Sequence, residues 1–577
     1  MNNKENQIQM KLGIYISIFF LLIALVASAQ EVPADNNKEV EIILLTGGGE
    51  VSIEKGKKIS EQPVFVDTVN VKVDVSYNTI DKKVENNFKV ETIKPPKLLI
   101  MEPLDKLSHG QLDLGLNDFK SPPFLNFTYS TLRNKDYNAG IKIRHFSSDL
   151  SVKNLSSTRF TETGAGVYGK KFYKNMVVSG SADYNYNTFR NFGYDPSLFN
   201  ISENSDKRFY SIFDLNGGVE SRNKERSAWH QKAQARYQQL FGKVNIEEHL
   251  ISASYSGHTY NLFKGKVDSL LPEKDFVRMS SVELSVQHLL SKDTTFLVES
   301  TLFDVSLFGY KLKGKGFNVK LNPIRSTFLS NKNRALLWTP TVEIDYAIAK
   351  DIFILYGGFE RKLERNHYLT YMQQNPFIGA NLPHTNTLTN YHISAGLKGA
   401  LTSKTTFNVG AHYRDVKDFV LFVNDVNSKA TRVYNVITDD VIHKQVFGEL
   451  MYENKKVKTG ILVEYNVYEV FNNEAYHLPA IKAQAFASYN VQDKFSIGTD
   501  IFYYGKQLAL DVVAATIPVT TIELKPILDF NISIDYHYSD KLGAFLKVNN
   551  ILSTKHQRWN QYPNYGINVL GGVSYTF

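Results

Sequence analysis

The final stretch of the chain, residues 566–577 (GINVLGGVSYTF), most constrains what this sequence can fold into. Its apolar residues stand at every second position, and mostly small or polar residues alternate with them. Such a period of two indicates a β-strand with two different faces, because successive side chains point to opposite sides. The stretch ends on an aromatic residue, which is typical of a strand that faces lipid on one side and a polar lumen on the other. The two sets are Ile567, Val569, Val573, Tyr575 and Phe577 against Asn568, Leu570, Gly572, Ser574 and Thr576.

The same alternation recurs along the chain from residue 110 onward. Residues 481–491, 532–538 and 542–548 carry apolar side chains at every second position, with Phe486 as an exception on the polar face. Tight polar turns separate such runs, and longer connections lie between the turns, as in membrane barrels with short turns at one end and long loops at the other. The predicted turns are at 133–135, 173–175, 223–225, 291–293, 349–351, 403–405, 454–456, 492–494 and 539–541.

These turns predict an all-β fold, a transmembrane antiparallel β-barrel of about 20 to 22 strands. With both termini at the turn end, the turns account for about 20 strands, and a further turn near Gly257 would raise the number to about 22. Residues 316–334 fit no position in this scheme. A soluble solenoid is disfavoured because the spacing of the turns is uneven. Separate soluble domains are disfavoured because no linker follows residue 109.

The amino-terminal residues indicate export. A basic start precedes an apolar run, and Ala27 and Ala29 fit the small-residue site at which signal peptides are cleaved. We therefore expect a signal peptide over residues 1–29, rather than an uncleaved membrane anchor, for which the apolar run is short. Residues 30–108 are rich in charge and contain a Pro-Pro break, which predicts a short amino-terminal periplasmic arm. The barrel is then expected over residues 109–577.

The carboxy-terminal residues resemble a known family. They look like the last two strands of TonB-dependent receptors, in which an Asn-Leu-Phe-like corner precedes a Tyr-Pro and a Gly-led final strand, although Ile551 and Leu552 replace the Leu-Phe here. The likeness extends over about residues 335–577 and is most specific near the end. That family carries a plug inside its barrel, and residues 30–108 are too few to form one. The chain therefore resembles a plug-less relative of TonB-dependent receptors, of the type found in Bacteroidota. The residues that carry the resemblance are 547–552 (KVNNIL), Trp559, Tyr562, Pro563 and Gly566.

The resemblance implies an integral protein of the Gram-negative outer membrane that provides a route for solute passage or uptake. The alternative is a non-transporting barrel that serves as a platform or accessory subunit for a periplasmic or surface partner, such as a lipoprotein. The barrel would contact outer-membrane lipid and lipopolysaccharide. Residues 41–47 (EIILLTG) faintly resemble the box that engages TonB, but an ordinary β-prone run before a Gly-Gly-Gly turn explains them better, so TonB stays open as a partner. Tyr575 and Phe577 resemble the assembly signal that bacterial barrel-assembly machinery recognises.

Composition and motifs give no sign of catalysis. The chain has no Cys, which excludes thiol catalysis and disulfides, and its net charge of +8 is spread along the sequence, which disfavours nucleic-acid binding. Residues 164–169 (GAGVYG) match a dinucleotide-binding fingerprint, but they lie in an alternating run and not in a strand–turn–helix unit. Of Glu247, Glu248 and His249, only the first and third can share a face of a strand, which disfavours a metal site. We therefore expect no enzyme activity, no cofactor and no metal.

Overall fold

The structure is a computed structural model, and it describes the part of the chain that follows residue 106, with gaps. The predicted signal peptide, with Ala27 and Ala29, lies outside the described residues. So does the predicted arm as far as residue 106. The described residues are 107–117, 124–132, 134–149, 152, 157–193, 207–223, 225, 228–243, 245–260, 277–293, 297–314, 316–330, 335–349, 352–426, 433–492, 494–510 and 520–577.

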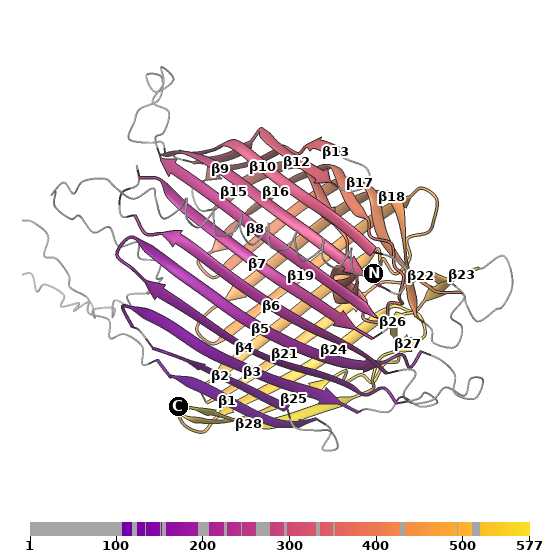
Figure 1. Cartoon of the computed structure of the whole chain (residues 1–577). Helices are drawn as coiled ribbons and strands as arrows, with labels where there is room; N and C mark the ends of the chain where they lie inside the picture. Colours follow the sequence, from indigo (N-terminus) through magenta and orange to yellow (C-terminus); the bar gives the residue numbers. More distant parts are fainter. Residues whose placement is uncertain are drawn as a thin grey trace, which may run out of the picture. The chain divides into compact units, whose positions relative to one another are not determined.

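These residues form a closed, all-β, antiparallel barrel. Each barrel strand pairs with the next along the chain, and β1 pairs with β28 to close the sheet (Figure 1). The sheet has 24 strands, but only Pro323 separates β11 from β12, and only Thr339 and Pro340 separate β13 from β14. Proline has no N–H to donate to the ladder, so each pair is one interrupted strand. The barrel therefore has 22 strands, which confirms the upper end of the predicted range.

The elements have the following bounds. The strands of the barrel are β1 (Gly110–Asn117), β2 (Phe124–Ser130), β3 (Tyr137–Ser148), β4 (Phe160–Phe172), β5 (Met176–Arg190), β6 (Lys207–Ser221), β7 (His230–Gly242), β8 (Ile246–Tyr260), β9 (Val277–Lys292), β10 (Leu297–Lys313), β11 (Phe317–Asn322), β12 (Ile324–Ser330), β13 (Ala335–Trp338), β14 (Thr341–Ala349), β15 (Phe353–Arg365), β16 (Asn386–Thr402), β17 (Thr405–Asn424), β18 (Tyr434–Glu453), β19 (Val457–Val470), β20 (Ile481–Val491), β21 (Phe495–Tyr504), β24 (Ile527–His537), β25 (Leu542–Asn549) and β28 (Asn568–Thr576). Two small hairpins, β22 (Gln507–Leu510) with β23 (Thr521–Leu524) and β26 (Gln557–Trp559) with β27 (Tyr562–Pro563), and the helix α2 (Tyr368–Gln374) lie in the connections. No helix within the described ranges is long and apolar enough to cross a membrane.

The strand register defines two different ends of the barrel. At the turn end, β1 begins and β28 ends, with Gln111 opposite Thr576. Tight connections such as 173–175, 403–404 and 454–456 lie at this end, as predicted. At the loop end lie α2 and the hairpins β22–β23 and β26–β27, which are gathered at the right of Figure 1. The carboxy terminus lies at the left of the figure.

The assignment of turns to ends is wrong at one place. The predicted turn at 291–293 joins β9 to β10 at the loop end, because Lys292 pairs with Leu297 of β10 and with Glu247 at the start of β8. The further turn predicted near Gly257 is also absent, since Gly257 lies within β8. β8 ends and β9 begins at the turn end instead. The unassigned residues 316–334 include β11 and β12, which follow β10 after a short turn-end connection.

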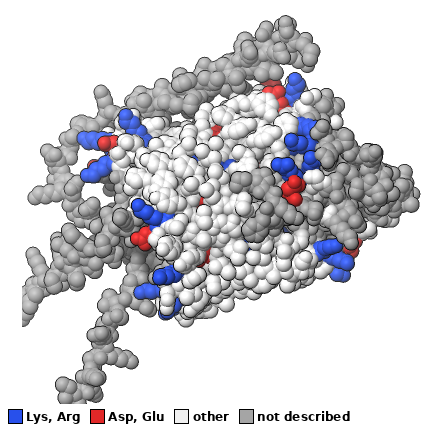
Figure 2. Space-filling model, turned by 90° about the horizontal axis from the view of Figure 1, so that it is seen from below, with Lys and Arg blue, Asp and Glu red and all other residues white. Residues whose placement is uncertain are grey.

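The two faces of the wall differ as the alternation predicts. In β14, Ile344 and Tyr346 are 46% and 55% exposed, whereas Asp345 between them forms an ion pair with Lys398 on the other face, at 2.9 Å. On the face shown in Figure 2, the charged residues of the described part lie mainly toward two sides, and a broad uncharged zone lies between them. An apolar outer band with polar groups inside is the arrangement that a bilayer requires.

Close approach explains two local features of the sequence. Phe486 faces the lumen and covers Gly460 of the neighbouring strand, where a Cβ would meet the phenyl ring. The G-x-G-x-x-G motif lies wholly inside β4, so it forms no strand–turn–helix unit. Its Gly166 lies beside the ion pair of Lys142 and Asp183, and a Cβ there would collide with both side chains. Glycine leaves room for these two side chains at this position.

Candidate functional site

Two loop-end segments fold together into a structure that we call the cap. Segment 366–385, between β15 and β16, contains α2, and segment 556–565, between β25 and β28, contains β26 and β27. The rings of Phe377 and Tyr562 join the two segments, stacked with their centroids 3.7 Å apart. In Figure 1, α2 lies within the outline of the barrel strands.

The sequence of α2 explains why it forms and where it ends. Tyr368, Leu369, Tyr371 and Met372 are all buried, and their spacing places them on one side of a helix. The first turn is closed by the hydroxyl of Thr370, which accepts the backbone N–H of residue 367 at 2.9 Å. The helix stops before Asn375-Pro376, because the residue before a proline disfavours helical geometry.

The cap packs against both sides of the barrel interior. Tyr368 contacts Tyr210 of β6, and Tyr371 contacts Phe422 of β17, each with ring centroids 6.4 Å apart. These two strands stand far apart in the order of the closed sheet, so the cap spans the lumen between them. The buried apolar cluster consists of Phe192, Tyr210, Leu240, Ile246, Tyr368, Leu369, Tyr371, Met372, Ile378, Leu382, Phe422, Tyr434, Val436 and Tyr562.

One carboxylate of the barrel wall anchors the cap. Glu248 of β8 is 2% exposed, and its carboxylate lies 2.5 Å from Nδ1 of His367. It also accepts the backbone N–H of Tyr368 at 2.9 Å and that of Leu369 at 3.3 Å. A second imidazole, that of His384, lies 3.9 Å away. A buried carboxylate is stable only where such donors surround it, so α2 and Glu248 satisfy each other.

This anchor was not predicted from the sequence. Glu247 and His249 do share one face, as predicted, and they contact each other at 3.0 Å. Glu248 points the other way, into the barrel, and the only sequence signal was a carboxylate on the lumenal side of a strand. Within the described ranges, no three His, Cys, Asp or Glu side chains gather into a group that could hold a metal ion.

The cap is also tied to neighbouring loops. Arg558 donates to the backbone carbonyl of His477 at 3.1 Å and to Oε1 of Gln507 at 2.6 Å. The imidazole of His477 is buried between the rings of Tyr434 and Trp559, with centroid distances of 5.5 and 5.0 Å. Burial lowers the pKa of His477 to about 3, so its side chain is neutral at physiological pH.

A chamber of about 660 Å³ lies between the cap and the wall, and we call it the loop-end chamber. Aromatic side chains and polar side chains both line it, and sites for small molecules combine apolar surface with such polar groups. Burial raises the pKa of Tyr565 to about 12, so its hydroxyl stays protonated and donates to the carbonyl of Thr158 at 2.8 Å. Lining residues include Phe160, Glu162, Asn185, Asn187, Phe377, Arg558, Trp559, Tyr562 and Tyr565.

The predicted assembly residues lie at the seam where the barrel closes. Tyr575 in β28 pairs with β1 and β25, and the backbone of Phe577 exchanges two hydrogen bonds of 3.0 Å with Gly110. The Phe577 ring stacks on Phe127, Tyr129 and Tyr575, with centroid distances of 6.2, 6.3 and 6.1 Å. The structure thus brings both residues into one aromatic cluster, distant from the cap.

The barrel is similar to solved structures of a transporter and of receptors. An iron transporter, FrpB from Neisseria meningitidis, superposes with a TM-score of 0.61 at 10% identity, covering 82% of both chains. The siderophore receptor PirA from Acinetobacter baumannii has a TM-score of 0.59 at 12% identity, with 82% of this chain and 81% of that chain covered. The pyoverdine receptor FpvA from Pseudomonas aeruginosa has a TM-score of 0.59 at 11% identity, with coverages of 82% and 79%.

At such identities the likeness establishes the fold alone. No protein-family model matches the sequence, and no curated protein matches it either. The similar structures are described as transporters and receptors and not as enzymes, which agrees with the expectation of a non-enzymatic barrel.

Proposed function

We propose that this protein is an outer-membrane barrel, related to TonB-dependent receptors, that takes up a solute through its lumen. The observation that carries the proposal is the loop-end chamber, which lies between the lumenal wall and a cap built from two loops. Its aromatic and amide groups suit a small organic solute. The likeness to an iron transporter and to siderophore receptors supports the same class of function.

In this proposal the loop end faces outside and the turn end faces the periplasm, since short turns are periplasmic in such barrels. The cap is the gate, and its release from Glu248 opens the loop-end chamber to the lumen. The signal peptide, the periplasmic arm and the absence of a plug are parts of the proposal that come from the sequence. A partner such as TonB or a lipoprotein would act at the turn end or on the surface.

Conductance in a planar bilayer tests the route. We expect the full chain to pass little current and the Glu248→Ala variant to pass distinctly more, because the cap loses its buried anchor. Glu247→Ala is the matched control, since this neighbouring side chain points away from the lumen, and it should behave as the full chain does. If Glu248→Ala passes no current, both with and without residues 30–108, the barrel is not a route for solutes.

A further inference from the structure

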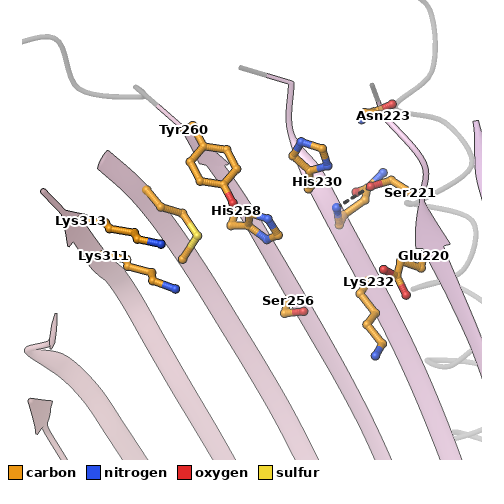
Figure 3. Close-up of a pocket in the computed structure, with 12 residues that line it drawn as sticks. Glu220, Ser221, Asn223, His230, Lys232, Ser256, His258, Tyr260, Lys311 and Lys313 are labelled. Atoms are coloured by element: carbon orange, nitrogen blue, oxygen red, sulfur yellow. Dashed lines mark hydrogen bonds between the residues drawn. The ribbon is translucent and has the colours of Figure 1, made fainter. Parts of the chain in front are cut away.

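A second chamber lies at the turn end of the barrel, on the wall formed by β6 to β10. It measures about 680 Å³, and we call it the turn-end chamber (Figure 3). The wall side that it occupies is lumenal, because Lys232 shares a face of β7 with Leu240, which belongs to the buried apolar cluster against the cap. Its lining residues include Glu220, His230, Lys232, His258, Lys311 and Lys313.

Positive charge in this chamber is not balanced by the wall. Lys232, Lys311 and Lys313 form no ion pair within 4.0 Å among the described residues, where only Glu220 contributes a carboxylate to the lining. Glu220 stands opposite Lys232 in the register, yet their charged groups do not meet. Figure 3 shows Lys311 and Lys313 projecting from β10 toward His258, and Lys232 and Glu220 on the far side of the chamber.

Three lumenal lysines elsewhere in the barrel are paired with carboxylates. Lys320 of β11 contacts Glu343 of the neighbouring β14 at 3.1 Å, and Lys142 of β3 contacts Asp183 of β5 at 2.8 Å across the intervening β4. Lys398 of β16 contacts Asp345 of β14 at 2.9 Å, across the intervening β15. The wall therefore supplies counter-charges for these lysines but leaves the lysines of the turn-end chamber without them.

Two stacked imidazoles add hydrogen-bonding groups between these lysines. His230 and His258 are direct register partners, and their rings stack with centroids 5.2 Å apart. Nε2 of His230 donates to the carbonyl of Glu225 at 3.0 Å, because a carbonyl oxygen only accepts, and this bond fixes the orientation of the ring. The chamber thus presents ammonium groups around an oriented imidazole pair. Three lysines repel a cation, so this is no metal site.

We propose that the turn-end chamber binds a small solute through carboxylate or phosphate groups. Ammonium groups bind such oxygens by charge-assisted hydrogen bonds. The proposal rests on the proposed function in one respect: it assigns an anionic group to the solute that passes through the lumen. The chamber is its binding site between the cap and the turn end.

Isothermal titration calorimetry of the purified full chain tests the site, with citrate and pyrophosphate as probes and glucose as a neutral reference. A variant with all three chamber lysines changed to Gln should bind both anions at least about tenfold more weakly, since losing even one charge-assisted hydrogen bond has that effect. The chamber variant combines Lys232→Gln, Lys311→Gln and Lys313→Gln. The matched control combines Lys455→Gln, Lys456→Gln and Lys541→Gln, which remove the same charge from exposed turns at the same end.

Equal affinity in the chamber and control variants, or no anion binding by the unaltered chain, would overturn the proposal. Binding by the unaltered chain should also weaken between 0.05 M and 0.5 M salt, because salt screens such contacts. This second measurement needs no variant, and binding that ignores salt would contradict the electrostatic site. Failure of the proposed function is distinguishable: a barrel that binds citrate but passes no current keeps the site and loses the route.

Discussion

Removing the carboxylate of Glu248 should release the cap from the barrel wall. In Glu248→Ala, the imidazole of His367 and the backbone N–H groups of Tyr368 and Leu369 lose their acceptor. An unsatisfied buried donor costs roughly 1–3 kcal/mol, and breaking a buried charged contact roughly 3–5 kcal/mol. We take about 3–5 kcal/mol as the loss in the free energy of cap closure, which raises the opening equilibrium constant by about 100-fold or more.

Cysteine labelling measures this opening directly, since the chain contains no Cys. Leu382 lies in the cap and in its buried apolar cluster, and it is 2% exposed. A Leu382→Cys thiol therefore reacts with a maleimide only when the cap opens. The labelling rate in outer membranes should rise about 100-fold or more in Glu248→Ala, and less in Glu248→Gln, which keeps one acceptor oxygen. Glu247→Ala is the matched control. A Glu248→Ala rate within about threefold of that control would refute the anchor.

The other two predictions concern the seam and the effect of pH. Deleting Tyr575–Phe577 removes the stacked rings and the backbone bonds to Gly110, so less barrel should reach the outer membrane; normal levels in membrane fractions would refute an assembly role. Burial in the folded state lowers the pKa of His477 from its ordinary value of about 6.5 to about 3. The cap should therefore keep its full stability above about pH 6.5 and lose stability as the pH falls from about 6.5 toward 3, because protonation of His477 then favours the open state. Labelling of Leu382→Cys, normalised to a free thiol at each pH, should rise over this window, and a rise of equal size in His477→Phe would contradict the assignment.

The strands were predictable from the sequence because their alternation is a local property. The same is true of most turns, whose polar residues signal a tight reversal wherever they occur. The end of the barrel at which a turn lies is not local, and so 291–293 is a tight turn at the loop end. The strand formed by β11 and β12 was not predicted, since Pro323 interrupts the alternation that marks the other strands.

The candidate site could not be predicted in the same way. Glu248 and His367 meet across 119 positions of sequence, and nothing near either residue indicates the other. The turn-end chamber likewise combines lysines from β7 and β10. Its positive charge depends on the absence of carboxylates within ion-pair distance of these lysines, which the sequence does not show. The alternation along the strand predicts only that Glu248 points into the lumen. It does not predict which residue the carboxylate contacts.

The pairing of β1 with β28 also has a kinetic consequence. Gly110 and Phe577 stand at opposite ends of the barrel sequence, so closure joins a loop of several hundred residues and costs about 5 kcal/mol in chain entropy. Until β28 is in place, β1 keeps an unpaired edge, which is a template for pairing with other chains. The pairing of β1 with β28 that completes the wall therefore removes this exposed edge, and its long sequence separation makes it slow to form.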